Sequence, residues 1–454
     1  MADFPGLEAA LAQLAAWPGV RRFILGYSGG VDSHVLLHRL AKQRDGDRSL
    51  TALYVDHGLQ TASAAWGEHC ASVCRGLNLP FRVVKIDARP APGESPEAAA
   101  RRARYAAFAA ELDAEAALLT AHHCDDQAET LLLQLLRGAG PHGLAAMPTA
   151  ARLGPGWLLR PLLKVEHGEI LAYAHAHRLR WIEDASNTDT GFDRNYLRHR
   201  ILPLLRERWP AANRTLARSA RLCAETAAWL DEQAAADLAW VATDRPDCLS
   251  IPALQGLSEI RQRHLLRYWL RYLHLPIPDA RQLHQLFRDV LTAAADRNPC
   301  VRWPGAEVRR YRNALYAMPP LPLHDPRHQF IWQADTQGWP PLQVPGLGQL
   351  HMQKTIGAGL CAKALAGRVL MVRFRQGGER FRPAGRRHGQ ELKKLLQQTG
   401  IPPWQRERLP LLYQEETLLA VVGLGVAADF AAEPGEAGWR PVFQSLSTAR
   451  SAIL

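Results

Sequence analysis

The sequence lacks any uninterrupted apolar run that approaches the roughly 20 residues needed to span a bilayer. It also lacks a Cys-x-x-Cys pair, and its seven cysteines are scattered along the 454 residues. Scattered cysteines in odd number predict reduced thiols in the cytoplasm and argue against a zinc ribbon or a cysteine-bound iron–sulfur cluster. We also find no export signal, because Phe4, Leu7, Leu11 and Leu14 instead predict an amphipathic helix.

The composition is that of a globular protein, with 47% hydrophobic and 22% charged residues, and the length favours two to three domains. The net charge of +11 is unevenly placed. Residues 368–408 hold eleven Lys or Arg against three Asp or Glu, and residues 194–221 hold eight Arg. Clustered arginine is typical of proteins that bind a phosphate backbone, although composition alone fits a solubilising basic face equally well.

Strand-like and helical patterns alternate through the first 200 residues. The strand candidates are 23–27, 51–55, 81–86 and 116–121, and the helical patterns cover 31–43, 96–113 and 125–137. This alternation predicts an α/β fold with a Rossmann-like parallel sheet covered on both faces. Ligands of such sheets bind beyond the carboxyl ends of the strands, so the residues that directly follow strands are the candidates for chemistry.

The rest of the chain predicts a central, mainly helical domain and a small α+β C-terminal domain. Helical patterns run from 204 to 298, and 301–316 predicts a β-hairpin. Residues 319–345 contain seven prolines, which favours a linker. The expected boundaries are 1–210, 211–318, 319–364 (linker and start of the C-terminal region) and 365–440.

The segment Ser28-Gly29-Gly30-Val31-Asp32-Ser33 lies between the first predicted strand and the first predicted helix. Glycines let the backbone turn so that its N–H groups face an anion, and the helix start adds unpaired donors and a partial positive charge. Serine hydroxyls suit phosphate oxygens, whereas Asp32 suits a metal ion. The segment is neither a Walker A loop nor a G-x-G-x-x-G fingerprint, since it has no Lys and the wrong glycine spacing. A purely structural turn is the alternative.

The segment 121–130 (AHHCDDQAET) also leads from a predicted strand into a helix, so it should rise from the same sheet edge. Asp126 and Glu129 share one helix face, and His122 precedes Asp126 across the strand–helix junction. Carboxylate and phosphate oxygens suit Mg²⁺, whereas one His with two acids is a poor match to zinc. The alternative is that these acids only complement the helix dipole.

Three further stretches are candidates. Arg101 and Arg104 lie on one face of a predicted helix and need an anionic partner or open solvent. Residues 194–200 (RNYLRHR) follow an Asx-rich loop and begin a basic helix. Asp56 and His57 follow the second predicted strand, so we expect them to face the same ligand crevice at the carboxyl ends of the strands. The alternative is that they only form a turn that closes the strand.

Together these segments resemble a known family. Ser28–Ser33 is similar to the PP-loop of the ATP pyrophosphatase superfamily, whose fold is of the adenine nucleotide alpha hydrolase-like type and whose members split ATP into AMP and pyrophosphate. The segments YVDHGL, EAAARRARY, AHHCDDQAET and DASNTDTGFDRNYLRHRILP resemble the tRNA(Ile)-lysidine synthetase family specifically. Residues 377–383 and 400–404 are similar to that family's terminal domain. Asp56 departs from the family, which more often has Asn there.

The resemblance implies a cytoplasmic ATP-dependent ligase that modifies the wobble cytidine of an isoleucine tRNA with a CAU anticodon. ATP adenylates the cytosine carbonyl oxygen, pyrophosphate leaves, and the ε-amine of L-lysine displaces AMP. The adenylate makes that oxygen a better leaving group, while loop amides, Mg²⁺ and arginines offset the charge that develops on pyrophosphate. The likeness also implies a homodimer, and it makes the central and C-terminal domains tRNA-binding.

The motif match assigns roles to individual residues. ATP binding is expected of Ser28, Gly29, Gly30, Val31, Asp32, Ser33 and His57, with Asp32 on Mg²⁺. Asp126 and Glu129 are expected to hold the amines of lysine or the metal, His122 to lie near the reacting phosphate, and Arg101 and Arg104 to clamp phosphate or tRNA. Contacts to the nucleotide, cytidine or tRNA are expected of Asn195, Arg198, Arg200, Arg380, Arg382, Arg386, Arg387, Lys393 and Lys394.

Rival functions are weaker. Enzymes that insert sulfur at cytidine typically use Cys-x-x-Cys pairs, which are absent here. A glutamine-dependent amidotransferase needs an ammonia-generating domain, and the sequence shows none. A non-catalytic RNA-binding protein with a decayed loop conflicts with the intact Ser28, Asp32 and Ser33.

Overall fold

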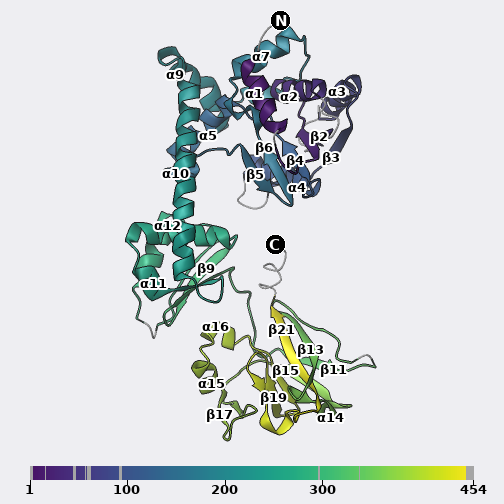
Figure 1. Cartoon of the computed structure of the whole chain (residues 1–454), viewed down its shortest axis with the longest axis vertical. Helices are drawn as coiled ribbons and strands as arrows, with labels where there is room; N and C mark the ends of the chain where they lie inside the picture. The colour runs from purple at the N-terminus through teal and green to yellow at the C-terminus, as the bar shows by residue number, and fades with distance from the viewer. Residues whose placement is uncertain are drawn as a thin grey trace. The chain divides into compact units, whose positions relative to one another are not determined.

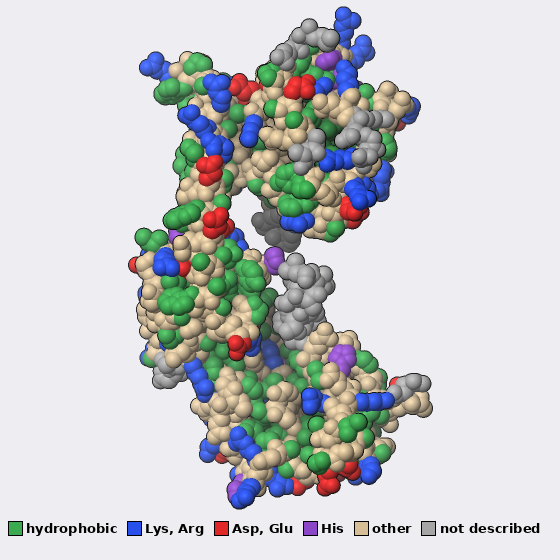
Figure 2. Space-filling model, in the orientation of Figure 1, with side chains coloured by type: hydrophobic (Ala, Val, Ile, Leu, Met, Phe, Trp, Pro, Cys, Tyr) green, Lys and Arg blue, Asp and Glu red, His purple; other side chains and the backbone are tan. Residues whose placement is uncertain are grey.

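The computed structural model describes residues 4–15, 17–43, 48–56, 58, 63–90, 95–294, 297–336 and 338–445. The chain divides into two compact units, Met1–Glu232 and Gln233–Leu454, drawn in Figure 1. Lys and Arg side chains are exposed on both units (Figure 2). No helix in the described ranges is long and apolar enough to cross a membrane.

The first unit is built on a six-stranded sheet of order β3-β2-β1-β4-β6-β5, in which every adjacent pair except β5–β6 is parallel. Its strands are β1 (Arg22–Gly26), β2 (Ser49–Asp56), β3 (Phe81–Lys85), β4 (Ala116–Leu119), β5 (Ala150–Leu153) and β6 (Gly156–Leu159). The α/β fold with a Rossmann-like parallel sheet, predicted from the alternating pattern, is therefore confirmed, with one antiparallel strand added at the edge.

Helices cover both faces of this sheet because successive strand residues point to opposite sides. The helices are α1 (Pro5–Ala15), α2 (Val31–Lys42), α3 (Ser63–Gly76), α4 (Pro96–Ala110), α5 (Cys124–Leu136), α6 (Pro141–Leu144) and α7 (His167–Ala176). On one face Leu25 packs with residues of α1, α2, α3 and α7. On the other face its neighbour Ile24 packs with Phe108 of α4.

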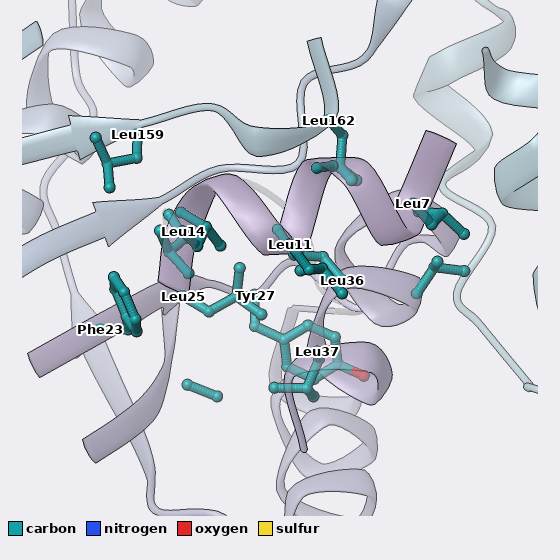
Figure 3. Packing of buried hydrophobic residues seen from close by; sticks show 14 of the residues in the cluster. Leu7, Leu11, Leu14, Phe23, Leu25, Tyr27, Leu36, Leu37, Leu159 and Leu162 are labelled. Atoms are coloured by element: carbon teal, nitrogen blue, oxygen red, sulfur yellow. The ribbon is translucent and has the colours of Figure 1, made fainter. Parts of the chain in front are cut away.

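The predicted amphipathic N-terminal helix is α1, and it closes the larger of these two cores (Figure 3). Leu7, Leu11 and Leu14 are all buried and face Leu25 and Leu36. Burying a leucine side chain of this kind stabilises the fold by about 1.5–3 kcal/mol relative to leaving it in water. The core fixes α2 against β1 and so holds the turn that joins them.

The strand order reverses at β1. The chain proceeds from β1 through β2 to β3 on one side, and then continues with β4 on the other side of β1. The loops that follow β1 and β4 therefore diverge from each other at the carboxyl ends of these two strands. Open α/β sheets bind ligands at such a position. Both predicted constellations follow these two strands.

The first unit ends in short helices before a long one. They are α8 (Asp193–Tyr196), the π-helical turn η3 (Leu197–Ile201), α9 (Leu202–Arg208) and α10 (Ala212–Val241), the last of which continues past the boundary of the unit.

In the second unit, the end of α10 is followed by a small helical region on a four-stranded antiparallel sheet of order β7-β10-β9-β8. Its elements are β7 (Cys248–Ser250), α11 (Ile251–Gln255), α12 (Glu259–Tyr272), α13 (Ala280–Gln285), η4 (Leu286–Leu291), β8 (Cys300–Trp303), β9 (Ala306–Tyr311) and β10 (Ala314–Met318). Leu265, Leu266 and Trp269 of α12 form its buried core. The predicted hairpin thus corresponds to β8, β9 and β10.

The C-terminal part of this unit contains a five-stranded sheet, β11-β15-β18-β19-β20, and a four-stranded sheet, β12-β13-β21-β14. The strands are β11 (Phe330–Gln333), β12 (Leu342–Val344), β13 (Gly348–Ile356), β14 (Leu360–Cys361), β15 (Val369–Arg373), β18 (Leu411–Gln414), β19 (Thr417–Val421), β20 (Gly425–Val426) and β21 (Ala437–Ser445). A short ribbon, β16 (Arg380–Phe381) with β17 (Gln390–Glu391), precedes α15 (Leu392–Gln398) and α16 (Pro403–Arg406), and α14 (Ala362–Leu365) follows β14.

The proline-rich stretch 319–345 differs from the expected linker. It contributes β11 and β12, which pair with β15 and β13. All seven prolines lie outside these two strands, so no ladder hydrogen bond is lost. The short runs Phe330–Gln333 and Leu342–Val344 carry too little periodicity to be recognised among the prolines.

Candidate active site

The loop between β1 and α2 holds the six residues predicted to grip phosphate. Gly29 has a φ of +83°, the left-handed conformation that favours glycine. Ser33 Oγ donates to the carbonyl oxygen of Gly30 at 3.0 Å and lies 3.2 Å from Ser28 Oγ. Among the described residues no side chain caps the start of α2, so its first N–H groups are left for an anion.

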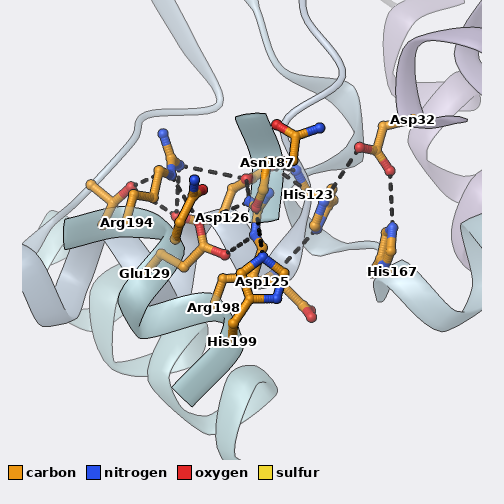
Figure 4. A network of polar contacts seen from close by, with 12 residues as sticks. Asp32, His123, Asp125, Asp126, Glu129, His167, Asn187, Arg194, Arg198 and His199 are labelled. Atoms are coloured by element: carbon orange, nitrogen blue, oxygen red, sulfur yellow. Dashed lines mark hydrogen bonds and ion pairs between the residues drawn. The ribbon is translucent and has the colours of Figure 1, made fainter. Parts of the chain in front are cut away.

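Asp32 lies between two histidines that come from different elements (Figure 4). Its Oδ2 is 3.7 Å from Nε2 of His123, which precedes α5, and its Oδ1 is 3.4 Å from Nε2 of His167, which begins α7. The two imidazole rings stack with centroids 4.8 Å apart. The neighbouring carboxylate of Asp32 raises the pKa of His167, although burial opposes it.

His123 also caps α5. Its Nδ1 accepts from the N–H of Asp125 at 3.3 Å, and its own backbone N–H donates to Asp126 Oδ2 at 3.0 Å. Because Nδ1 accepts, a neutral His123 carries its proton on Nε2. That N–H faces Asp32 and also Asp126, whose Oδ2 is 3.4 Å away. His123 thereby links the phosphate loop to α5.

Asp126 and Glu129 share one face of α5, as predicted, and two arginines pair with them (Figure 4). Arg194 donates to Glu129 at 2.8 Å, and Arg198 donates to Glu129 at 2.6 Å and to Asp126 at 2.9 Å. Glu129 is fully buried. Burial alone would raise the pKa of Asp126, but the charges of His123 and Arg194 outweigh burial and lower it to about 2.

These arginines reach α5 because they are four residues apart, on α8 and the π-helical turn η3. π-Helical turns are rare and often found at functional sites. Arg198, expected at the nucleotide or the cytidine, therefore lies on the acids of α5 in this structure. Asn195 donates to the carbonyl oxygen of Asp189 at 2.9 Å, and Arg200 is exposed.

His122 lies next to His123 but in a different environment. Its Nδ1 is 2.9 Å from Thr120 Oγ1, and burial lowers its pKa to about 3, so the ring is neutral. The structure thus places His123 rather than His122 beside Asp32. Successive residues after a strand point to opposite sides, which explains why only one of the pair faces the loop.

The two arginines of α4 differ in exposure. Arg101 is exposed and stacks over the ring of Tyr105 at 4.9 Å. Arg104 is half-buried, and burial, with the charges of Arg101 and Arg194, lowers its pKa. The charge of Arg194 acts on Arg104, and the charge of Arg101 acts on His122, so both arginines of α4 lie near the site.

His57 lies outside the described residues. Its neighbour Asp56 closes a turn after β2, because its Oδ1 accepts from Gly58 N–H at 2.9 Å and from Ser63 Oγ. These contacts hold Asp56 in a turn, and the ATP-binding role of His57 stays a prediction.

Three residues of the network, His123, His167 and Arg194, were not among the predicted site residues. His123 and Arg194 belong to the segments that carried the resemblance, where neighbouring residues were chosen instead. No sequence pattern around His167 indicates a functional site. A 3-10 turn, Pro161–Lys164, separates it from the end of β6, and it approaches Asp32 only through tertiary packing.

The predicted tRNA contacts of the second unit lie on the ribbon β16–β17, in the loop that joins its two strands, and on α15. Arg380, Arg386, Arg387, Lys393 and Lys394 are exposed, whereas Arg382 is half-buried and paired with Asp429. Lys394 Nζ is 3.9 Å from Glu391, a distance at which an exposed pair contributes little to stability. These cations are therefore available to an anionic partner.

Comparison with known proteins covers all three regions. A PP-loop domain family matches residues 5–205, a TilS substrate binding domain family matches 249–316, and a TilS substrate C-terminal domain family matches 370–443. The chain is 44% identical to a tRNA(Ile)-lysidine synthase of Coxiella burnetii over 420 residues, covering 92% of both chains. It is 44% identical to a tRNA(Ile)-lysidine synthase of Methylococcus capsulatus, covering 90% of this chain and 93% of that one. A Pseudomonas aeruginosa tRNA(Ile)-lysidine synthase is 43% identical, with 96% of each chain covered.

Proposed function

This chain belongs to the tRNA(Ile)-lysidine synthase family and is an ATP-dependent ligase that modifies tRNA, and we propose that the site beyond β1 and β4 carries out its chemistry. One observation carries this proposal. The loop Ser28–Ser33 and the acid–arginine network of α5 meet at the point where the strand order reverses, and His123 joins them. An ATP site and a site for a charged second substrate are thus adjacent.

The first half-reaction needs a site for the triphosphate. The uncapped start of α2 and the hydroxyls of Ser28 and Ser33 suit phosphate oxygens. Asp32 would hold Mg²⁺, and the residue fits that role: its Oδ1 is buried and has no hydrogen-bond partner among the described residues. When bound, the cation would offset negative charge on the phosphates.

The reaction proceeds by two displacements. The carbonyl oxygen of the wobble cytosine attacks the α-phosphorus of ATP, and the bond to pyrophosphate breaks. The ε-amine of L-lysine then attacks the ring carbon that bears this oxygen, and the C–O bond breaks to release AMP. Arg104 and Arg101 would contact phosphate or tRNA near the first step, and Asn195 and Arg200 would contact the nucleotide or the cytidine.

The network on α5 would bind the amino acid. Asp126 and Glu129 supply acceptors for ammonium groups, and Arg194 and Arg198 supply donors for a carboxylate. A free lysine carries both kinds of group. With its ε-amine deprotonated for the attack it has no net charge, so it can exchange partners with this network while every buried charge stays paired. Neutral His122 lies near this network, because the charges of Asp126 and Arg194 act on it.

The second unit would bind the body of the tRNA. RNA helices are recognised largely through shape and backbone, which suits the exposed cations near α15. Because tRNA and ATP are both its substrates, we place the enzyme in the cytoplasm. The resemblance implies a homodimer, which light scattering of the purified protein would test.

One assay tests the proposed function. The purified protein is incubated with ATP, Mg²⁺, labelled L-lysine and an isoleucine tRNA with a CAU anticodon. We expect label in the tRNA together with AMP and pyrophosphate in solution. The control is the same tRNA with uridine in place of the wobble cytidine, which should stay unlabelled. Sulfur transfer, release of ADP, or tRNA without lysine would each overturn the proposal.

A further inference from the structure

The carboxylate oxygen Oδ1 of Asp32 faces His167 of α7. It is buried, and within the described ranges it accepts no hydrogen bond that meets ordinary geometry. The nitrogen nearest to it in an ion-pair contact is Nε2 of His167, at 3.4 Å. The other oxygen, Oδ2, faces Nε2 of His123 at 3.7 Å. Each carboxylate oxygen is thus approached by one imidazole.

Two imidazoles and one carboxylate could be a metal site in their own right, since their donor atoms lie within 4.8 Å of one another. The capping geometry argues against this. Nδ1 of His123 accepts from the backbone N–H of Asp125, so Nε2 carries the proton and has no lone pair for a metal. His123 is therefore a donor to carboxylates, and the pair of histidines supports Asp32 rather than sharing a metal ion with it.

The position of His167 is fixed by packing. It is the first residue of α7, and Ile170 and Tyr173 of the same helix are buried in the core that α1 and α2 share. Its ring stacks on that of His123 with an angle of 22° between the planes. His167 thus presents Nε2 to Asp32 from a rigid element.

We propose that His167 is a positioning residue that orients the carboxylate of Asp32 toward the cation bound with ATP. The proposal rests on the proposed function, in which Asp32 faces that cation. A carboxylate oxygen has two lone pairs, so Oδ1 can accept an N–H from His167 and still face a cation. Groups that orient a ligand in this way commonly change metal affinity about 10- to 100-fold when removed.

The two features of His167 can be separated by substitution. His167→Phe keeps a ring that stacks on His123 but removes the N–H, whereas His167→Gln keeps an N–H donor but removes the ring. His175→Phe is the matched control, because His175 lies on the same helix but is exposed and packs on Trp181. Binding of Mn²⁺ in the presence of ATP is measured by electron paramagnetic resonance, without tRNA or lysine, and thermal unfolding is measured in parallel.

We expect His167→Phe to weaken Mn²⁺ binding in the ATP complex by about tenfold or more, with an unfolding midpoint close to that of the unmodified chain. His167→Gln should bind Mn²⁺ within about threefold of the unmodified chain, and His175→Phe should not change it. Equal Mn²⁺ affinity in His167→Phe and the unmodified chain would overturn the assignment. Equal loss in the Phe and Gln variants would overturn it too, because the ring and not the N–H would then matter.

Failure of this inference is distinct from failure of the proposed function. If the unmodified chain forms no lysidine, the proposed function fails, whatever the Mn²⁺ measurement gives. If lysidine forms and the Phe variant binds Mn²⁺ normally, only the role of His167 fails. Because Mn²⁺ binding is an equilibrium measurement, a variant that is inactive for another reason does not mimic the expected result.

Discussion

Four charged side chains neutralise one another beside the phosphate loop. Asp126 and Glu129 bring two negative charges to α5, and Arg194 and Arg198 bring two positive charges. Loss of one member of a buried pair typically costs about 3–5 kcal/mol, because its partner keeps a buried charge. The network is therefore held together in the absence of substrate, and only a ligand with both kinds of charge can replace its contacts without that cost.

His122 provides a test at the residue scale. Its pKa in the folded chain is about 3, against 6.5 for an unperturbed histidine, so the unfolded chain binds more protons between these values. The stability that it contributes is complete above pH 6.5 and falls as the pH drops toward 3, by about 1.4 kcal/mol per pH unit. We expect the unmodified chain to lose about 2 kcal/mol more than His122→Asn between pH 6.5 and pH 5.

Urea unfolding of both proteins at several pH values checks this expectation. His34 and His38 also have pKa values lowered, mainly by burial, to about 4, but they are present in both proteins and cancel in the difference. Asn keeps an acceptor or donor near Thr120, where Nδ1 of His122 lies. A difference between the two proteins that does not change with pH would show that folding leaves the pKa of His122 unchanged.

At the scale of elements, hydrophobic periodicity was sufficient for the strands and helices that position the site. The predicted strand 23–27 is β1 (Arg22–Gly26), and the predicted helix 31–43 is α2 (Val31–Lys42). Apolar spacing identifies such elements because each must bury one face, and the functional loops follow from their ends. This is why Ser28–Ser33, Asp126 and Glu129 could be selected from the sequence.

The contacts between elements could not be predicted in the same way. His167 reaches Asp32 only because α7 packs against α2, and Arg194 reaches Glu129 only because α8 lies against α5. Neither pair shares a local sequence pattern, since each depends on tertiary packing. His122 and His123 are adjacent, so only the direction of the chain after β4 decides which of them faces the loop.

Gly29 provides the test at the scale of the turn. Its φ of +83° is strained for other residues, and a Cβ there would lie 2.4 Å from Ile182 Cδ1 and 3.0 Å from Cys70 Sγ. We expect Gly29→Ala to destabilise the chain by at least about 1–2 kcal/mol and to weaken ATP binding about tenfold or more, because the loop must shift. Thermal unfolding without nucleotide and calorimetry with ATP measure the two effects.

The neighbouring glycine is the control for this substitution. Gly30 has an ordinary φ of −69°, and a Cβ there would meet only Ser28 Oγ, at 3.5 Å. Gly30→Ala should therefore cost less than about 1 kcal/mol, the usual range for an alanine at a helix N-cap. If both variants lose the same stability, the left-handed turn at Gly29 is not what shapes the loop.

At the scale of the whole molecule, the residues proposed to bind ATP and lysine and the basic cluster proposed to bind the body of the tRNA lie in different units. Every residue assigned to ATP or lysine lies between Ser28 and Arg200, within Met1–Glu232. The segment 368–408, with its excess of eight positive charges, lies wholly in Gln233–Leu454. Changes to these cations should thus alter tRNA binding while sparing ATP binding.

The double variant Lys393→Ala/Lys394→Ala tests this separation. Each lysine that neutralises a phosphate contributes a slope of about −0.7 to −0.9 to the plot of log affinity against log salt concentration. We expect weaker tRNA binding at low salt and a slope that is less steep by about 1 to 2, with ATP affinity unchanged. Filter binding of the tRNA at several salt concentrations measures the slope.

Net charge alone could produce a similar trend, so the control removes the same charge elsewhere. Lys354 stacks over Trp439, and Lys363 pairs with Glu436, both in the same unit but away from α15. The variant Lys354→Ala/Lys363→Ala loses two positive charges as well and should keep the slope of the unmodified chain. Equal slopes in the two double variants would mean that tRNA responds to the overall field of the protein. A reduced slope only for Lys393 and Lys394 would mean that these two side chains lie on its phosphates.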